Sequence, residues 1–214
     1  PQLQAFASRF AGLPVRNSGT LGGNVANGSP IGDSMPLLIA LGAHVVLMRQ
    51  RGGQTRHREM ALEALYTGYR QTVLQADEVL AWIKVPKPGL GELCRVYKIS
   101  KRFEDDISAV CLVVNMTVAG GSVAAVSIGA GGVAATPMRA TQAEAALRGQ
   151  AWTQDTVQSA IHVLRSEFTP LSDLRASADY RKQVLGNLLQ RFWLESQGQR
   201  HINLESFTCE GESL

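Results

Sequence analysis

The amino-acid sequence predicts an α+β fold in which short strands come first and longer helices follow. Hydrophobic residues make up 45% of the 214 residues, which is enough apolar side chain for a sizeable core. Short apolar or β-branched runs bounded by glycine or proline fill the first part of the chain, and later segments carry apolar residues at three- and four-residue spacing. The change between these two patterns near residue 140 places the sheets before the helices.

The N-terminal segment predicts a short helix and then a long loop. Apolar residues at helical spacing mark Gln2–Phe10 as the helix, and Gly12 and Pro14 end it. From residue 16 to residue 36 the chain reads RNSGTLGGNVANGSPIGDSMP, which is dense in Gly, Asn and Ser and is typical of loops with special backbone geometry. Consecutive glycines let a pyrophosphate come close to the backbone, whose N–H groups bind anionic oxygens in such turns. On composition alone, an ordinary irregular loop is the alternative.

A second helix and two strands are expected next. Asp33 is suited to the N-cap of this helix, and Gly42 lies near its end. The apolar runs His44–Met48 and Val79–Val85 are expected to be strands of one mixed sheet. Residues 1–88 are therefore expected to form an α/β layer.

The segment PKPGLG at residues 86–91 predicts a linker, because two prolines and two glycines prevent both helix and strand from continuing. The strands expected beyond it, with a tight hairpin turn at Gly120 and Gly121, are Arg95–Ser100, Ile107–Val118 and Val123–Gly129. The helices expected after them are Ala140–Leu147, Thr153–Phe168 and Ala178–Glu195. Residues 92–197 are thus expected to form an α+β domain with an antiparallel three-stranded sheet and helices, followed by a tail at residues 198–214.

Composition and charge exclude several classes of protein. Lys and Arg total 21 against 18 Asp and Glu, and this small excess does not indicate a nucleic-acid partner. Cys94, Cys111 and Cys209 stand far apart without a nearby His, so no metal ligands are expected, and a reducing cytoplasm fits. The sequence has no apolar run of about 18 residues, so no membrane association is expected.

The order of residues in the glycine-rich segment resembles the FAD-binding motif of molybdenum hydroxylase flavoprotein domains. The family's run holds Gly-Gly-Asn, then Ala-Ser-Pro or Gly-Ser-Pro, then an Asp before a Pro. The matching positions here are Gly22, Gly23, Asn24, Gly28, Ser29, Pro30, Asp33 and Pro36. The resemblance continues through YKISKRFEDDISAV at residues 97–110 and covers nearly all of residues 5–197.

This resemblance implies both a fold and a set of cofactor contacts. The fold is the C-terminal part of a PCMH-type FAD-binding α/β domain, followed by a C-terminal domain like that of the carbon monoxide dehydrogenase flavoprotein. Carried over position by position, the FAD contacts fall on Phe10, Thr20, Leu21, Gly22, Gly23, Asn24, Asp33, Leu80 and Lys98.

Each implied contact has a physical rationale. Phe10 and Leu80 are expected to wall the apolar parts of the cofactor, while the Gly-Gly-Asn step approaches its polar linker. Asp33 would accept a hydrogen bond from a ribose hydroxyl, cap its helix, or do both. Lys98 would balance negative charge on the pyrophosphate or on the reduced flavin, and a solvated strand lysine is the alternative.

The function implied by the resemblance is electron transfer. Substrate is hydroxylated at a molybdenum cofactor on another subunit, electrons pass through [2Fe-2S] clusters to FAD, and NAD+ is the acceptor. Within the family the chain looks most similar to the bacterial xanthine dehydrogenase small subunit, which oxidises hypoxanthine and xanthine. The implied partners are a molybdenum-cofactor-binding large subunit and an iron-sulfur domain in a hetero-oligomer, and no residue of this chain is expected to be catalytic.

Departures from the family pattern leave a second function open. The family's flavin domain has a further N-terminal lobe with a second pyrophosphate-binding loop, preceded by iron-sulfur domains, and this chain is expected to begin after them. The alternative function is therefore a truncated, non-catalytic binding or assembly module of the same complex. A flavin oxidase of the wider superfamily is disfavoured, because no His or Cys lies in a motif that would tether the flavin.

Overall fold

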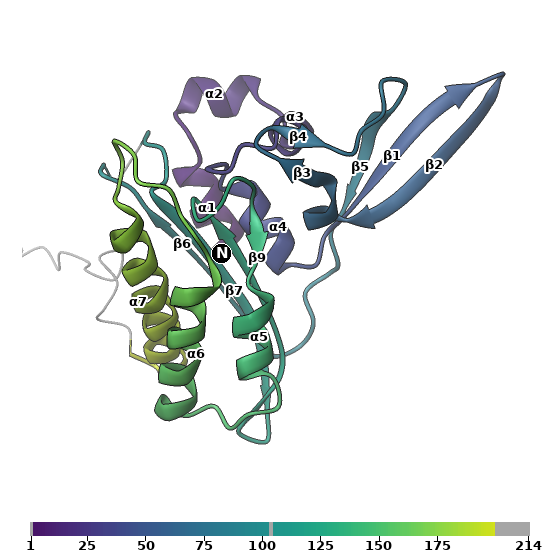
Figure 1. The fold of residues 1–214 in the computed structure, drawn as a ribbon. Helices are drawn as coiled ribbons and strands as arrows, with labels where there is room; N and C mark the ends of the chain where they lie inside the picture. Colours follow the sequence, from purple (N-terminus) through teal and green to yellow (C-terminus); the bar gives the residue numbers. More distant parts are fainter. Residues whose placement is uncertain (1, 103–104, 200–214) are drawn as a thin grey trace, which may run out of the picture.

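The computed structural model describes residues 2–102 and 105–199, with side chains described from Phe6 onward (Figure 1). The helices are α1 (Gln2–Arg9), α2 (Leu13–Ser18), α3 (Leu21–Asn27), α4 (Ser34–Ala40), the 3-10 helix η1 (Leu62–Leu65), α5 (Thr141–Leu147), α6 (Gln154–Glu167) and α7 (Ala178–Ser196). The strands are β1 (His44–Arg51), β2 (Gln54–Ala61), β3 (Tyr66–Gly68), β4 (Gln71–Thr72), β5 (Val79–Lys84), β6 (Glu92–Ile99), β7 (Val110–Ala119), β8 (Ser122–Gly131) and β9 (Met138–Arg139). They form three antiparallel sheets with the orders β2-β1-β5, β3-β4 and β6-β7-β8-β9.

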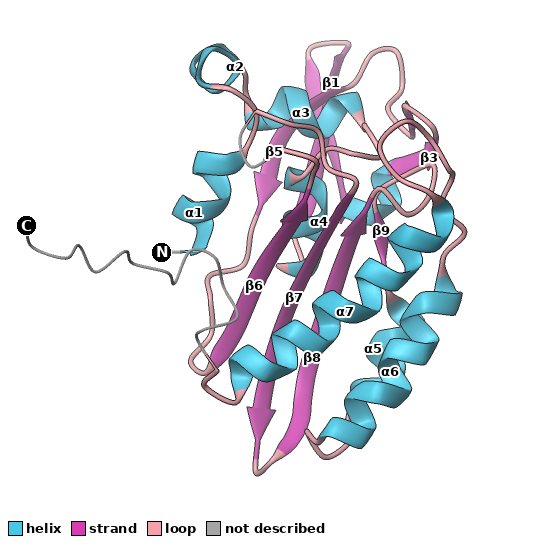
Figure 2. Cartoon of the chain, turned by 90° about the vertical axis from the view of Figure 1, so that its left-hand side faces the viewer, coloured by secondary structure: helices cyan, strands magenta, loops and turns pink. Residues whose placement is uncertain are grey.

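The four-stranded sheet is covered by helices on both faces (Figure 2). Side chains of β8 alternate between the faces, as the two-residue period of a strand requires. Val126, Ile128 and Ala130 belong to the core beneath α5, α6 and α7, whereas Gly129 and Gly131 lie against α4. The three strands predicted for this sheet are β6, β7 and β8, and the two-residue strand β9 extends it at the edge.

Helix α4 joins the two halves of the fold because it is apolar on every side. All seven of its residues are buried, which marks a helix packed within the protein rather than upon it. Leu37 and Ala40 pack against the four-stranded sheet, while Met35, Leu38 and Ile39 pack into the core beneath the three-stranded sheet. The start of α4 is therefore held firmly by both cores.

The two long hairpins turn on glycine pairs with positive φ. Gly120 and Gly121 have φ of 57° and 77°, and they confirm the predicted turn between β7 and β8. Gly52 and Gly53 have φ of 58° and 78° and join β1 to β2. The prediction of a mixed sheet here was wrong, because β1 pairs antiparallel with β2 and β5. Strand β2 was missed because QTRHREMA is polar on both faces and shows no apolar alternation.

The glycine-rich segment is more helical than its composition predicted. Pro14 lies in the first turn of α2, where its missing N–H costs nothing, so it begins a helix as well as following one. Thr20 caps α3 by accepting a hydrogen bond from Gly23 N at 3.0 Å, and Gly28 ends α3 in the left-handed conformation at φ 60°. These two caps turn a segment predicted to be a loop into a short helix.

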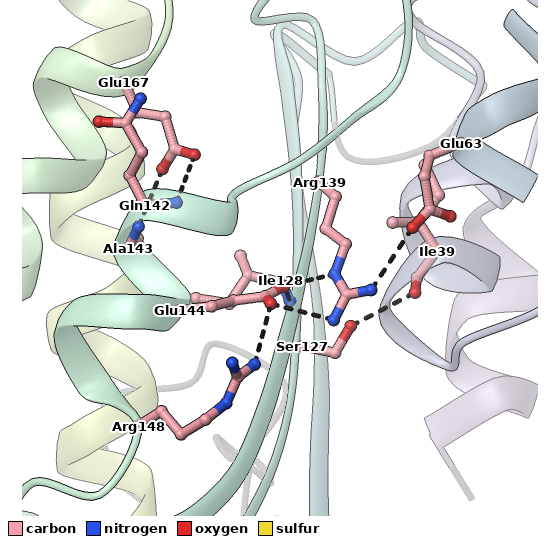
Figure 3. Close-up of polar contacts among 10 residues, drawn as sticks. All are labelled: Ile39, Glu63, Ser127, Ile128, Arg139, Gln142, Ala143, Glu144, Arg148 and Glu167. Carbon is pink, nitrogen blue, oxygen red and sulfur yellow. Dashed lines mark hydrogen bonds and ion pairs between the residues drawn. The ribbon is translucent and has the colours of Figure 1, made fainter. Parts of the chain in front are cut away.

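A buried carboxylate on α5, Glu144, holds the arginine that links the two halves of the fold (Figure 3). Glu144 on α5 accepts hydrogen bonds from the N–H of Ile128 at 2.8 Å and from Arg139 Nε at 2.9 Å. Arg148 lies 3.5 Å from the same carboxylate, and Arg139 also reaches Glu63 of η1 at 3.5 Å. Arg139 thereby ties the helical layer to η1, which comes directly after β2 of the three-stranded sheet.

The ion pair between Arg58 on β2 and Glu78 fixes the β1–β2 hairpin, and we expect its contribution to stability to be lost in acid. Glu78 accepts from Arg58 Nε and Nη2 at 2.9 and 2.7 Å and from Gln75 N at 3.0 Å. The hydrogen bonds from Arg58 come first among the causes that lower the pKa of Glu78 from 4.5 to about 2. A lowered pKa stabilises the fold fully above the unfolded value, and this contribution is lost as the pH falls from 4.5 towards about 2.

Melting temperatures measured from pH 7 to pH 2 test this prediction. Glu78→Gln is expected to melt below the wild type at pH 7, and the gap is expected to close between pH 4.5 and about 2. A gap that stays constant across this range would mean that ionisation of Glu78 does not anchor the hairpin.

No helix within the described part of the chain is long and apolar enough to cross a membrane. The same residues contain no group of three or more His, Cys, Asp or Glu side chains placed to hold a metal ion. Most of the tail predicted at residues 198–214 lies outside the described residues.

Candidate functional site

The chain holds a groove of about 600 Å³ whose lining comes from α1, α2, α3 and the start of α4. Figure 2 shows α1, α2 and α3 near one end of the four-stranded sheet. The volume of the groove lies in the range of ~300–1,000 Å³ that is usual for ligand sites. The residues that line it are Phe6, Ala7, Phe10, Val15, Arg16, Gly19, Thr20, Leu21, Gly23, Asn24, Asn27 and Ser34. We call this the α1–α3 groove.

One wall of the groove is apolar and aromatic. The ring of Phe6 on α1 and that of Phe10, directly after α1, lie 6.1 Å apart at an interplanar angle of 47°. Val15 and Leu21 are 53% and 50% exposed, although both are large hydrophobic residues. Exposed apolar side chains gathered in one hollow indicate a binding surface rather than a solvated one.

The glycines at the start of α3 leave its backbone accessible. A Cβ at Gly23 would lie 2.9 Å from Thr20 Oγ1, so a side chain at this position would displace the cap of the helix. A Cβ at Gly22 would meet nothing within 4 Å. A ligand can therefore come close to the main chain of this turn, which is the approach that the polar linker of a dinucleotide requires.

The base of the groove carries a polar pair. Ser34 is 3% exposed, and its hydroxyl donates to Asn24 Oδ1. With its oxygen bonded to Ser34, the Asn24 amide presents its NH2 group as a donor. Behind α3, Tyr66 Oη donates to Val25 O at 3.0 Å, and its ring lies 3.1 Å from where a Cβ at Gly28 would stand. The rear of α3 is thus fixed while its front stays open.

Asp33 and Lys98 lie behind the groove and not among its lining residues. Lys98 Nζ is 2.9 Å from Asp33 Oδ2, and both side chains are 6% exposed. Lys98 also donates to Arg9 O at 3.1 Å, and Ser108 Oγ donates to Asp33 Oδ1. Asp33 stands at the N-cap position of α4, but its carboxylate makes no capping hydrogen bond. This pair therefore joins α1, α4 and β6 from within the core.

The thiol of Cys111 lies close to this ion pair. Burial raises the pKa of Cys111 well above its ordinary value, and the charge of Asp33 adds to the effect. Cys111 Sγ lies 3.9 Å from Asp33 O. The thiol therefore stays neutral and packs as a small apolar group.

The other predicted site residues divide between the groove and its surroundings. Phe10, Thr20, Leu21, Gly23 and Asn24 line the groove, and Gly22 belongs to the same turn. Leu80 lies on β5, which contacts α3, and it packs half-buried against the core beneath the three-stranded sheet. The structure thus brings five of the nine residues to one surface.

Seven lining residues were not among the predicted contacts: Phe6, Ala7, Val15, Arg16, Gly19, Asn27 and Ser34. Arg16 and Ser34 are the two that carry polar groups used below. The sequence pattern marks Arg16 only as the first residue of the glycine-rich segment, and it marks Ser34 only as part of the predicted helix. No local signal marks either of them, because each reaches the groove through the packing of α2 and α4. Of the described residues that line the groove, only Arg16 is charged.

The composition of the groove matches one kind of ligand. Aromatic and aliphatic walls suit a flat ring system, while an open glycine turn and amide donors suit a polar linker. The fold and the groove together therefore define a nucleotide-cofactor-binding protein.

Comparisons with known proteins give the family. Residues 1–88 match the FAD binding domain in molybdopterin dehydrogenase, and residues 95–196 match the CO dehydrogenase flavoprotein C-terminal domain. The carbon monoxide dehydrogenase medium chain of Hydrogenophaga pseudoflava is 33% identical over 191 residues, which are 89% of this chain and 65% of that protein. The xanthine dehydrogenase/oxidase of Gallus gallus is 32% identical over 192 residues, which are 86% of this chain and 14% of that protein.

A solved structure agrees with these matches. The carbon monoxide dehydrogenase from Hydrogenophaga pseudoflava that lacks the Mo-pyranopterin moiety of its cofactor superimposes with a TM-score of 0.82 and 34% identity, over 89% of this chain and 65% of that chain. The chain belongs to the FAD-binding flavoprotein family of the molybdenum hydroxylases. The predicted family, the predicted fold class and FAD as the family's cofactor are confirmed. The chain spans less than two thirds of the carbon monoxide dehydrogenase medium chain.

Proposed function

We propose that this chain is the FAD-binding electron-transfer module of a xanthine dehydrogenase-type molybdenum hydroxylase. Its role is to carry electrons from [2Fe-2S] clusters to NAD+ during the oxidation of hypoxanthine and xanthine. The observation that carries the proposal is the α1–α3 groove, whose glycine turn and aromatic wall lie within the segment that matches the FAD-binding family.

The groove fits part of FAD on the evidence of its own residues. Phe10 and Leu21 supply apolar wall. Gly23, which also lines the groove, carries no side chain, so the polar linker can come close to the backbone there. The Asn24 amide, oriented by Ser34, donates a hydrogen bond to that linker. FAD, when bound, supplies the redox chemistry, and the chain's residues hold and orient it.

The substrate and the acceptor rest on resemblance. The runs RNSGTLGGNVANGSPIGDSMP and YKISKRFEDDISAV favour the xanthine dehydrogenase branch. Overall identity does not separate the branches, since the carbon monoxide and xanthine enzymes are 33% and 32% identical to the chain. Reconstitution with a molybdenum-cofactor subunit and an iron-sulfur domain, assayed with xanthine, carbon monoxide and NAD+, distinguishes the two branches.

A reducing cytoplasm is the proposed compartment, because it suits the free thiols of Cys94 and Cys111.

The proposal also assigns the domains of the chain. Residues 1–88 form the FAD-binding part and residues 92–197 the flavoprotein C-terminal part, with residues 198–214 as a tail. Leu80 would contact the cofactor from β5, beside α3, and Asp33 and Lys98 would support the groove from behind.

Gly22→Val tests FAD binding by the groove. The Cβ at Gly22 has open space, so the variant is expected to fold normally. Gly22 lies between Leu21 and Gly23, which line the groove, so the valine side chain adds bulk beside that lining. FAD affinity, measured by quenching of flavin fluorescence, is expected to fall at least about tenfold, which corresponds to ~1.4 kcal/mol.

The matched control is Ala26→Val, at an exposed position one helical turn further along α3, away from the glycine turn. It introduces the same β-branched side chain and is expected to bind FAD as the wild type does. A folded wild type that binds no FAD would favour the non-catalytic assembly module. Equal affinity in both variants would place the cofactor elsewhere.

A further inference from the structure

The diphosphate of a dinucleotide needs positive charge or several donors close by, because it carries two negative charges. Lys98, which resemblance assigned to this task, is committed elsewhere. Its ammonium is 6% exposed, lies 2.9 Å from Asp33 and donates to Arg9 O at 3.1 Å. The counter-charge for the cofactor therefore has to come from another residue.

Arg16 lies in the groove and has half of its guanidinium available. Its Nη1 donates to Phe10 O at 3.0 Å and to Ala11 O, which fixes the side chain against the end of α1. Neither Nε nor Nη2 has an acceptor among the described residues. These two atoms form one edge of the planar guanidinium, and that edge binds two oxygens of one phosphate side by side.

The surroundings of Arg16 favour an anionic ligand over a protein partner. No carboxylate is found among the described residues that line the groove. The start of α3 lines the same groove through Thr20, Leu21 and Gly23, and the amide of Asn24 supplies a side-chain donor there. A guanidinium held in place in a groove without a carboxylate suits a phosphate group.

We propose that Arg16 binds the diphosphate of the cofactor through its Nε and Nη2 edge. Lys98 then acts as an internal support of the groove. This inference rests on the proposed function, because it assigns a residue to the FAD site. It goes further by naming a recognition element for any ligand that presents the same diphosphate, such as ADP.

The competing explanation is that Arg16 only braces the end of α1 through Nη1. Ligands with and without phosphate separate the two roles. FAD and ADP contain the diphosphate, whereas riboflavin has the flavin ring without any phosphate. Loss of a brace would weaken every ligand that uses the groove, but loss of a phosphate contact would weaken only FAD and ADP.

The experiment measures dissociation constants of the full chain for FAD, ADP and riboflavin by calorimetry. Arg16→Gln is expected to weaken FAD and ADP by about 10- to 100-fold, as expected for a charge-assisted pair of hydrogen bonds, and to leave riboflavin within about twofold. Arg16→Lys keeps the charge but loses the flat edge, so an intermediate loss is expected. The dependence of FAD affinity on salt should also become shallower in Arg16→Gln.

Arg56→Gln is the matched control, because Arg56 is exposed on the β1–β2 hairpin and makes no ion pair with the described residues. It is expected to bind all three ligands as the wild type does. An equal loss for riboflavin and FAD in Arg16→Gln, or unchanged FAD affinity, would overturn the assignment. A wild type that binds neither FAD nor ADP would instead overturn the proposed function, and the assignment with it.

Discussion

Gly129→Ala is expected to cause a large loss of stability. An alanine Cβ at this position would lie 2.0 Å from the carbonyl oxygen of Pro36 and 2.9 Å from its Cα. Both contacts involve the backbone of α4, so no side-chain rotation relieves them. Helix α4 is buried on all sides and cannot shift without opening both cores.

The expected cost is at least about 4 kcal/mol, beyond the ~1–3 kcal/mol usual for overpacking, because a whole helix must move. For a chain of this size, that loss lowers the melting temperature by at least ~8 °C. Thermal and urea unfolding of the wild type and the variant measure it.

Ala125→Ser is the control for this substitution. It adds one atom at an exposed position of the same strand and is expected to change stability by no more than about 0.5 kcal/mol. If Gly129→Ala costs less than about 1 kcal/mol, then α4 does not rest on the backbone of β8. FAD affinity should fall along with stability in Gly129→Ala, since α4 carries Ser34 at the base of the groove.

The helices that the sequence predicted well are specified by residues within the helix itself or directly before it. Helix α6 was predicted at Thr153–Phe168, and Thr153 caps it by accepting from Thr156 N at 3.4 Å. Ser177 caps α7 in the same way, with Tyr180 N at 3.2 Å. A capping side chain and a three-to-four apolar period lie within one stretch of chain, so reading that stretch is sufficient.

The elements that were missed depend on partners far away in the chain. Strand β2 exists because β1 pairs with it, and its own side chains give no alternation. Helix α3 contains two glycines, which composition reads as a loop, yet Tyr66 supports it from 41 residues away. Tertiary contacts such as that of Tyr66 add to the local caps of α3, Thr20 and Gly28, and the sequence pattern does not show those contacts.

In the candidate site too, residues that are adjacent in sequence were predicted together, whereas a contact between distant residues was not. The motif from Thr20 to Asn24 is continuous in sequence, and the structure places it on one groove with Phe10. Lys98 and Asp33 are 65 positions apart, and the sequence did not show that they face each other inside the core. Whether these residues contact FAD stays a prediction, which the variants of Gly22 and Arg16 test.

The second large expected effect comes from breaking the buried ion pair between Asp33 and Lys98. Lys98→Met is expected to cost about 3–5 kcal/mol, because it removes the ammonium group 2.9 Å from the buried Asp33 carboxylate, which then keeps the hydrogen bond from Ser108 but loses its ion pair with Lys98. The groove should lose affinity for FAD as well, since the bond from Lys98 to Arg9 O holds the end of α1 next to Phe10. Urea unfolding and FAD titration measure the two effects.

Two further variants test whether the effect of Lys98→Met comes from the burial of the ion pair. Lys84→Met removes a lysine that lies 2.5 Å from Glu59, but these side chains are 59% and 39% exposed. Water and salt screen that pair, so its loss is expected to change stability far less. Adding Asp33→Asn to Lys98→Met removes the carboxylate charge and should recover part of the lost stability. If Lys98→Met and Lys84→Met prove equally mild, the Asp33–Lys98 pair is hydrated in solution and does not support the groove.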